Sequence, residues 1–180
     1  MQRKSFSGFQ RGLSLIEVCI TLAVVAILAG TAAPSFIETF QKRALDGIAG
    51  ELVTDLYLAR SAATSHQDGV RFSMHAVAGG SCLVVHTGAV ADCACASDGV
   101  AQCTNGASLI KSNFYAASKG VTVTANVASI RFDPTHGKAT PAATVRVMAA
   151  DGREVRHVVN IMGRVRSCSP QGSAAGYSPC

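Results

Sequence analysis

A single carboxylate, Glu17, stands inside a long apolar segment that follows a short basic one. Residues 1–12 contain no acidic residue and end at Gly12, and residues 13–33 are almost entirely apolar. A carboxylate in such a segment costs a few kcal/mol to insert into a membrane, which favours a functional role. An ammonium group placed beside Glu17 in a low dielectric would neutralise this charge.

The apolar segment is long enough to cross a bilayer. Its 21 residues would span about 30 Å as a helix, and the basic residues on its N-terminal side place that side in the cytoplasm. A secretory signal peptide and a plain single-pass anchor are the ordinary alternatives. Against them, the small residue Gly12 precedes the apolar segment, whereas a secretory signal has its cleavage site after it.

A helical pattern continues beyond Pro34, which we expect to kink the helix because proline lacks a backbone donor. Apolar residues recur at three- and four-residue spacing to about Ser65, so one face can pack against a folded domain. The positions that define this face are Leu45, Ile48, Leu52, Leu56, Ala59 and Ala63.

After Gly69 the hydrophobic period changes from helical to two, and turn residues separate the runs. Asp151-Gly152 is the clearest hairpin signal. The sequence therefore predicts an α+β protein with a long N-terminal helix packed on an antiparallel β-sheet head. The predicted strands are residues 70–76, 82–87, 109–115, 121–125, 130–133, 144–149, 154–161 and 164–168.

The N-terminal residues resemble the type IV pilin and type II pseudopilin superfamily. The shared features are the basic leader, Gly12, Glu17 as the fifth residue after it, and Pro34; Leu13 replaces the commoner phenylalanine or methionine. The resemblance implies a pilin-like fold, cleavage after Gly12 by a prepilin peptidase and N-methylation of Leu13. It also implies that Glu17 meets the N-terminal amine of a neighbouring subunit.

This resemblance predicts a single-pass protein of the inner membrane, with its head in the periplasm, that joins a filament with other pilin or pseudopilin subunits. The expected organisation is a leader peptide at 1–12, a transmembrane and assembly helix at 13–34, its amphipathic continuation at 35–66, a periplasmic β-rich head at 67–168 and a tail at 169–180.

Two segments of the head resemble H-type pseudopilins and FimT-type minor pilins. They are residues 130–137 (Ile-Arg-Phe-Asp-Pro-Thr-His-Gly) and 163–166 (Gly-Arg-Val-Arg). The FimT-like branch implies DNA capture for uptake through Gly163, Arg164 and Arg166; the H-type branch implies a structural part of a type II secretion system that binds no DNA. By spacing alone, two arginines on an edge strand are better explained as solvated charges that prevent aggregation, and it is the resemblance that favours DNA binding.

Charge is concentrated in the C-terminal third. The chain has a formal charge of +5, which becomes +2 once the three cations of the leader are removed, whereas residues 131–166 carry seven cations and three carboxylates. Alternate arginines on a strand project to one face and could hold phosphates without reading bases. Four further cations would extend this patch: Lys138, Arg146, Arg153 and Arg156. Two carboxylates interrupt it: Asp151 and Glu154.

Six cysteines follow the apolar segment, and in an exported head they predict disulfides rather than a metal site. They are Cys82, Cys93, Cys95, Cys103, Cys168 and Cys180. A zinc site that includes His86 is the alternative. Cys93 or Cys95 could bond Cys103, and Cys168 could bond Cys180, while Cys19 is expected to fill space. No catalytic motif is present, so we expect neither an enzyme nor a cofactor.

Overall fold

The computed structural model describes residues 14–66 and 69–180, and Gly12 and Leu13 lie outside this part of the chain. The chain divides into two compact units between Thr39 and Phe40. Helix α1 (Leu15–His66) contributes to both. It continues through Pro34, which therefore does not end it.

The first unit is helical, and the described apolar side chains of residues 15–31 are exposed. Glu17 lies in the first turn of α1, where the helix dipole favours a negative charge. Cys19 is an exposed free cysteine. The predicted membrane span is not confirmed, because no helix in the described part of the chain combines the length and apolarity needed to cross a membrane.

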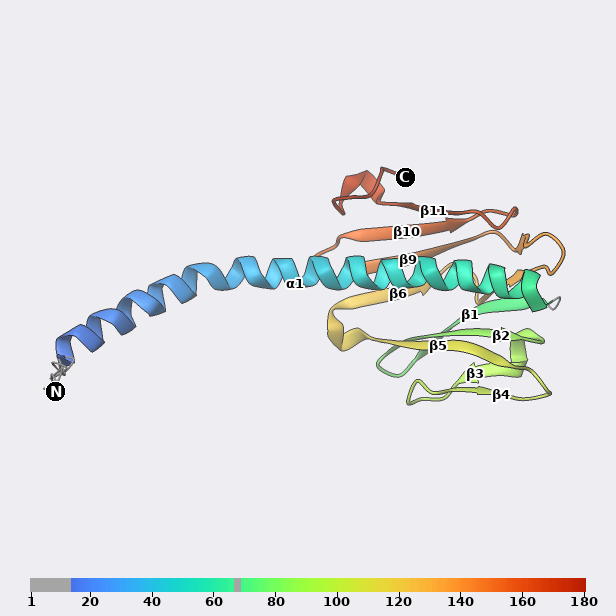
Figure 1. Cartoon of the computed structure of the whole chain (residues 1–180), viewed down its shortest axis with the longest axis horizontal. Coiled ribbons are helices and arrows are strands. Elements are labelled where there is room, and N and C mark those ends of the chain that lie inside the picture. Colours follow the sequence, from blue (N-terminus) through green and yellow to red (C-terminus); the bar gives the residue numbers. More distant parts are fainter. Residues whose placement is uncertain (1–13, 67–68) are drawn as a thin grey trace, which may run out of the picture. The chain divides into compact units, whose positions relative to one another are not determined.

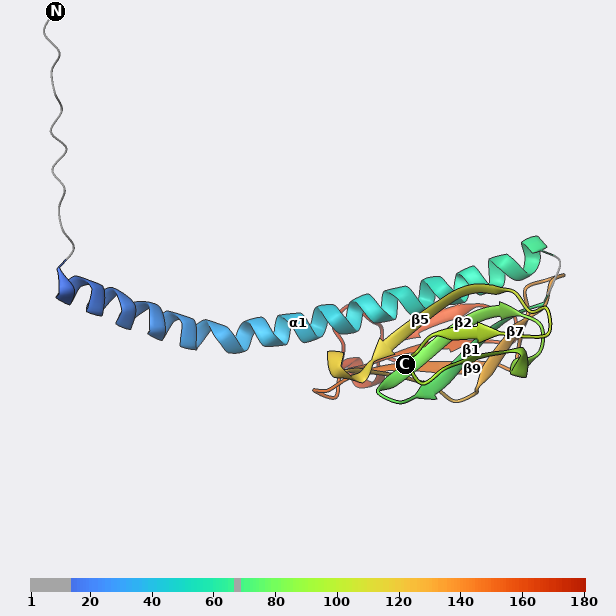
Figure 2. The same ribbon diagram turned by 90° about the horizontal axis from the view of Figure 1, so that it is seen from below.

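In the second unit, residues 40–66 of α1 pack on the sheets through one apolar face, as their spacing predicts. The buried positions of this face alternate between three- and four-residue steps, which keeps them on one side of a helix. They are Leu45, Ala49, Leu52, Leu56, Ala59 and Ala63. Figures 1 and 2 show this part of α1 lying along one side of the strands.

The head contains a five-stranded and a four-stranded antiparallel sheet. The first has the order β5-β2-β1-β7-β8 and the second β11-β10-β9-β6. The strands of the first are β1 (Val70–Val77), β2 (Gly80–Thr87), β5 (Leu109–Ala116), β7 (Ser129–Phe132) and β8 (Ala139–Thr140). Those of the second are β6 (Val121–Ala125), β9 (Ala143–Ala149), β10 (Glu154–Val159) and β11 (Val165–Cys168).

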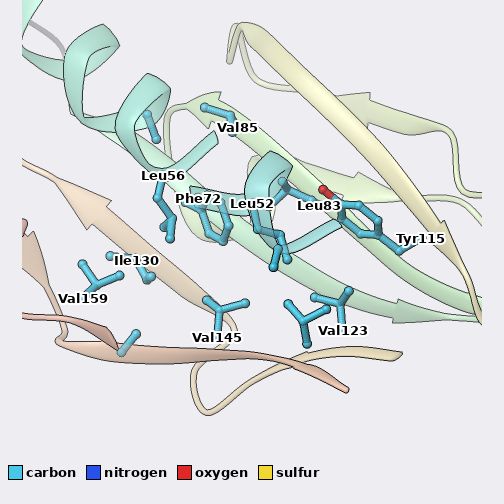
Figure 3. Packing of buried hydrophobic residues seen from close by; sticks show 14 of the residues in the cluster. Leu52, Leu56, Phe72, Leu83, Val85, Tyr115, Val123, Ile130, Val145 and Val159 are labelled. Carbon is cyan, nitrogen blue, oxygen red and sulfur yellow. The ribbon is translucent and has the colours of Figure 1, made fainter. Parts of the chain in front are cut away.

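One hydrophobic core joins the inner faces of both sheets to α1 (Figure 3). Leu52 and Leu56 of the helix meet Phe72 and Leu83 of the five-stranded sheet and Val145 of the four-stranded sheet. Ser81 links the sheets directly, since its hydroxyl donates to the carbonyl oxygen of Val123 at 2.6 Å. All buried core residues of the described chain lie between Leu45 and Ala174, so residues 40–180 contain the whole core and form a domain.

The α+β class is confirmed, with several differences of detail. The predicted strand at 164–168 begins at Val165, so Arg164 lies just before it. The predicted strand at 154–161 ends at Val159, because Asn160 begins a turn. The short strand β8 was not predicted. Neither was the two-stranded sheet of β3 (Cys93–Cys95) and β4 (Ala101–Cys103), which covers β2 on the side away from α1.

Candidate nucleic-acid interface

Asn160 and Gly163 form the turn between β10 and β11. The Asn160 side-chain oxygen accepts the Arg164 N–H at 3.0 Å, and its carbonyl oxygen accepts the Gly163 N–H at 2.9 Å. Gly163 has a φ of +71°, a left-handed conformation that glycine adopts without strain. This turn fixes the point at which the chain enters β11, the strand of the hairpin that contains Arg166. Asn160 was not singled out from the sequence, although asparagine shortly before glycine is a turn signal.

Arg164 and Arg166 project from the edge of the four-stranded sheet, away from α1. Val165 between them packs on the core, so alternation along the chain directs both arginines outward. Arg166 lies opposite Val158 of β10, which is 38% exposed on the same face. Both arginine side chains are exposed.

Arg164 and Arg166 have no counter-charge among the described residues. Within residues 14–66 and 69–180, no side-chain hydrogen bond or ion pair engages the guanidinium of Arg164 or Arg166. Both line a surface hollow of about 370 Å³, which also includes Val158, Asn160 and Val165. Free guanidinium groups can bind phosphate oxygens in a bidentate manner, and the aliphatic floor offers no ring on which a base could stack.

The other cations of the four-stranded sheet are engaged by carboxylates. Glu154 accepts a hydrogen bond from Arg156 Nε at 2.7 Å and lies 3.9 Å from Arg146 Nε. The hydrogen bond from Arg156 is the main cause that lowers the pKa of Glu154. Arg153 pairs with Asp151 in the hairpin turn. The carboxylates Asp151 and Glu154 thus interrupt the basic patch as predicted, because they pair with Arg146, Arg153 and Arg156. They do not pair with Arg164 or Arg166.

The hairpin is attached to the turn at 133–138, where Lys138 is exposed. Ala139 N–H, directly after this turn, donates to the carbonyl oxygen of Ile161 at 3.1 Å. Arg60 of α1 donates from Nε to the carbonyl oxygen of Gly137 at 3.2 Å. Three distant parts of the sequence are thus joined at one end of the head (Figure 1).

The six cysteines of the head form three disulfides. Cys93 bonds Cys103 and Cys168 bonds Cys180, which are pairs that the sequence left open, while Cys82 bonds Cys95. Because zinc binds thiolates, cysteines joined in disulfides cannot serve as its ligands, and the proposed zinc site is not formed by these cysteines. His86 instead makes hydrogen bonds with Ser73 Oγ through Nε2 and with the carbonyl oxygen of Thr87 through Nδ1.

Comparisons with known proteins agree with this fold. The family model described as "Type II transport protein GspH" matches residues 49–163, more than half of the chain. No curated protein sequence matches. The crystal structure of the type IV minor pilin FimU from Pseudomonas aeruginosa in space group P21 is similar, with a TM-score of 0.51 and 18% identity over 72% of this chain and 94% of that chain. A P65 crystal form of FimU gives a TM-score of 0.48 and 18% identity over 70% and 97%.

The FimU structure shares the pilin fold, in which an N-terminal helix packs on an antiparallel sheet. The match to the family model extends from the buried face of α1 to Gly163 at the β10–β11 turn. This chain belongs to the GspH family of pilin and pseudopilin subunits.

Proposed function

We propose that this chain is a minor type IV pilin whose head binds the DNA backbone through Arg164 and Arg166, as in the FimT-like branch. The observation that carries the proposal is that both guanidinium groups are exposed on one face, without a counter-charge in the described chain. Gly163 contributes by shaping the turn.

The spacing of the two arginines suits a phosphate backbone. Alternate residues of an extended chain are about 7 Å apart, comparable with successive phosphates along one strand. Contacts of this kind position DNA without reading its sequence. We therefore expect binding that is strongly salt-dependent and nearly indifferent to base sequence.

The test is a titration of labelled duplex DNA with a protein of residues 40–180. Binding is measured by fluorescence anisotropy at a series of salt concentrations. The variant is Arg164→Ala/Arg166→Ala, and the charge-matched control is Lys42→Ala/Lys119→Ala, which removes two exposed cations elsewhere. Loss of two phosphate contacts should lower the slope of log K against log salt by about 1.8. Equal slopes for the two double variants would exclude DNA capture by this motif.

The second candidate is a structural minor pseudopilin of a type II secretion system, and the description of the matched family favours it. In that role the head would contact other subunits only. If the unaltered head binds DNA no more strongly than the Arg164→Ala/Arg166→Ala variant does, this second candidate is supported.

Assembly is proposed from the N-terminal sequence. A prepilin peptidase would cut after Gly12 in the inner membrane, where residues 13–34 hold the precursor, and Leu13 would be methylated. Glu17 would then pair with the amine of a neighbouring subunit, with Pro34 shaping the helix. Coexpression with a prepilin peptidase tests the first step: mass spectrometry should find Leu13 as the N-terminus, and an unchanged precursor would contradict it.

A further inference from the structure

Two arginines stand directly opposite each other on the outer face of the five-stranded sheet. Arg71 of β1 is the cross-strand partner of Arg131 of β7. Like charges in this position are unfavourable. Burial, and secondly the neighbouring Arg131, lower the pKa of Arg71. Such a pair would be stabilised by an anion between or beside the two groups.

A polar pocket of about 350 Å³ adjoins this pair. Among the described residues that line it, Arg131 is the only charged one. The guanidinium of Arg131 lies so close to Gly69 that a β-carbon there would come within 2.7 Å of Nη2. The rest of the lining is small and uncharged: Gly69, Thr87, Gly88, Asn105, Gly106 and Ala107. The pocket therefore offers one cation and space for a small oxyanion.

The two carboxylates found near the pair in the described chain, Asp92 and Asp133, are hydrogen-bonded by neutral groups and keep their charge, and Asp92 acts on Arg71 electrostatically. Asp92 accepts hydrogen bonds from Asn105 Nδ2 at 2.9 Å and from Ala89 N–H at 2.6 Å. Asp133 accepts three backbone N–H groups of its own turn, at 2.8 to 2.9 Å. In the described part of the chain, neither Arg71 nor Arg131 forms an ion pair; Arg71 Nε instead donates to the carbonyl oxygen of Gly88 at 2.9 Å.

This pocket and the Gly163–Arg166 segment lie at the same end of the head. Arg131 pairs with Thr140 of β8, and the preceding residue, Ala139, is hydrogen-bonded to Ile161 in the β10–β11 turn. Two steps between neighbouring strands place Arg131 about 10 Å from that turn. Arg131 is exposed on the outer face of its sheet, as Arg164 and Arg166 are on theirs, away from α1.

We infer that Arg131, supported by Arg71, binds a second phosphate of the same DNA, seated in the pocket at Gly69, Gly88 and Asn105. The inference rests on the proposed function and extends it from a pair of arginines to a track across the end of both sheets. A backbone phosphate fits because it is a small oxyanion with a single charge, and because contacts at the same end of the head can lie on one duplex.

The experiment uses residues 40–180 and the same DNA titration. Arg131→Gln should lower the salt slope by about 0.9 and weaken binding about tenfold near 0.1 M salt. The matched control Lys119→Gln, which removes an exposed cation next to β6, should leave the slope unchanged. Arg131→Lys should keep the slope, because it keeps the charge. Thermal unfolding of each variant shows whether the fold is retained.

The outcomes separate this inference from the proposed function. If Arg131→Gln matches Lys119→Gln while Arg164→Ala/Arg166→Ala lowers the slope, the second contact is overturned and DNA capture stands. If no variant differs from the unaltered head, both are overturned. An amide chemical-shift titration with inorganic phosphate gives an independent readout: shifts at Gly88 and Asn105 should disappear in Arg131→Gln, and their absence in the unaltered head contradicts the pocket as an anion site.

Discussion

The α-carbon of Gly163 lies against the carbonyl oxygen of Gly137, so closely that a β-carbon at position 163 would overlap this oxygen. Gly137 ends the Pro-Thr-His-Gly turn, and Gly163 begins the Gly-Arg-Val-Arg segment. The two sequence motifs of the head that resemble the family therefore contact each other through these two glycines. The glycine of the second motif is needed for packing, and the side chains of the arginines that follow it have no partner in the described part of the chain.

Gly163→Ala should lower the free energy of unfolding by about 3 kcal/mol, because it combines a left-handed backbone with a steric overlap. Gly152→Ala is the matched control, since its φ of +87° is also left-handed but its added β-carbon meets open space. We expect about 1 kcal/mol for the control. Urea unfolding of residues 40–180 measures both, and equal losses would show that the contact with Gly137 is unimportant.

Asp55 is a fully buried carboxylate on the sheet-facing side of α1. Lys111 Nζ approaches it to 2.6 Å and Asn113 Nδ2 to 2.7 Å, both from β5. Lys111→Met should lower the free energy of unfolding by about 2 kcal/mol, since it leaves a buried charge without its cation; the value is moderate because Lys111 is partly exposed. The double variant Asp55→Leu/Lys111→Met should lose less than the two single variants together in a double-mutant cycle. Strict additivity would contradict the pairing.

Periodicity was sufficient to predict the long helix and most strands. The helical spacing runs from Leu45 to Ala63, and α1 ends three residues later at His66, one residue beyond Ser65. The period-two runs correspond to the strands of both main sheets. The strands that were missed are short. β3 and β4 have no alternating pattern. Cys93 and Cys103 are cross-strand partners joined by a disulfide, one of the two pairings that the sequence left open, but this pairing did not by itself predict strands.

The outward direction of Arg166 follows from alternation along β11, so it could be predicted, whereas Arg164 lies one residue before this strand. Pairing across strands could not be predicted, because it depends on the register between distant segments. Arg146 reaches Glu154 only because β9 pairs with β10, and Arg71 meets Arg131 only because β1 pairs with β7. The sequence thus singled out the candidate arginines of one hairpin, whereas the second arginine pair required the fold.

The C-terminal tail is closed by the disulfide between Cys168 and Cys180. Ser169 is buried, with its hydroxyl donating to the carbonyl oxygen of Glu154, and Ala174 is buried as well. Cys168→Ser/Cys180→Ser should lower the free energy of unfolding by about 3 kcal/mol, as expected for a short closed loop. Limited proteolysis should then cut within residues 169–180. A tail that remains protected would show that the hydrogen bonds of Ser169 suffice to hold it.

His157 of β10 faces α1 and is buried, with Nδ1 hydrogen-bonded to Ser167 Oγ at 2.8 Å. Burial lowers the pKa of His157 to about 4, although the carbonyl of Ala49 in α1 favours the protonated ring. No hydrogen-bond partner for Nε2 is found among the described residues. The neutral ring is therefore the form that the folded head accommodates.

The head should lose stability as the pH falls from about 6.5 towards 4. In this range the unfolded chain binds a proton at position 157 and the folded chain does not, so stability rises with pH. Between pH 7.5 and pH 5 the contribution of His157 is about 2 kcal/mol. Urea unfolding of His157→Gln should show a pH dependence that is flatter by this amount, whereas His136→Gln, in an exposed turn, should match the unaltered head. Parallel pH profiles for all three proteins would mean that His157 titrates normally in the folded state.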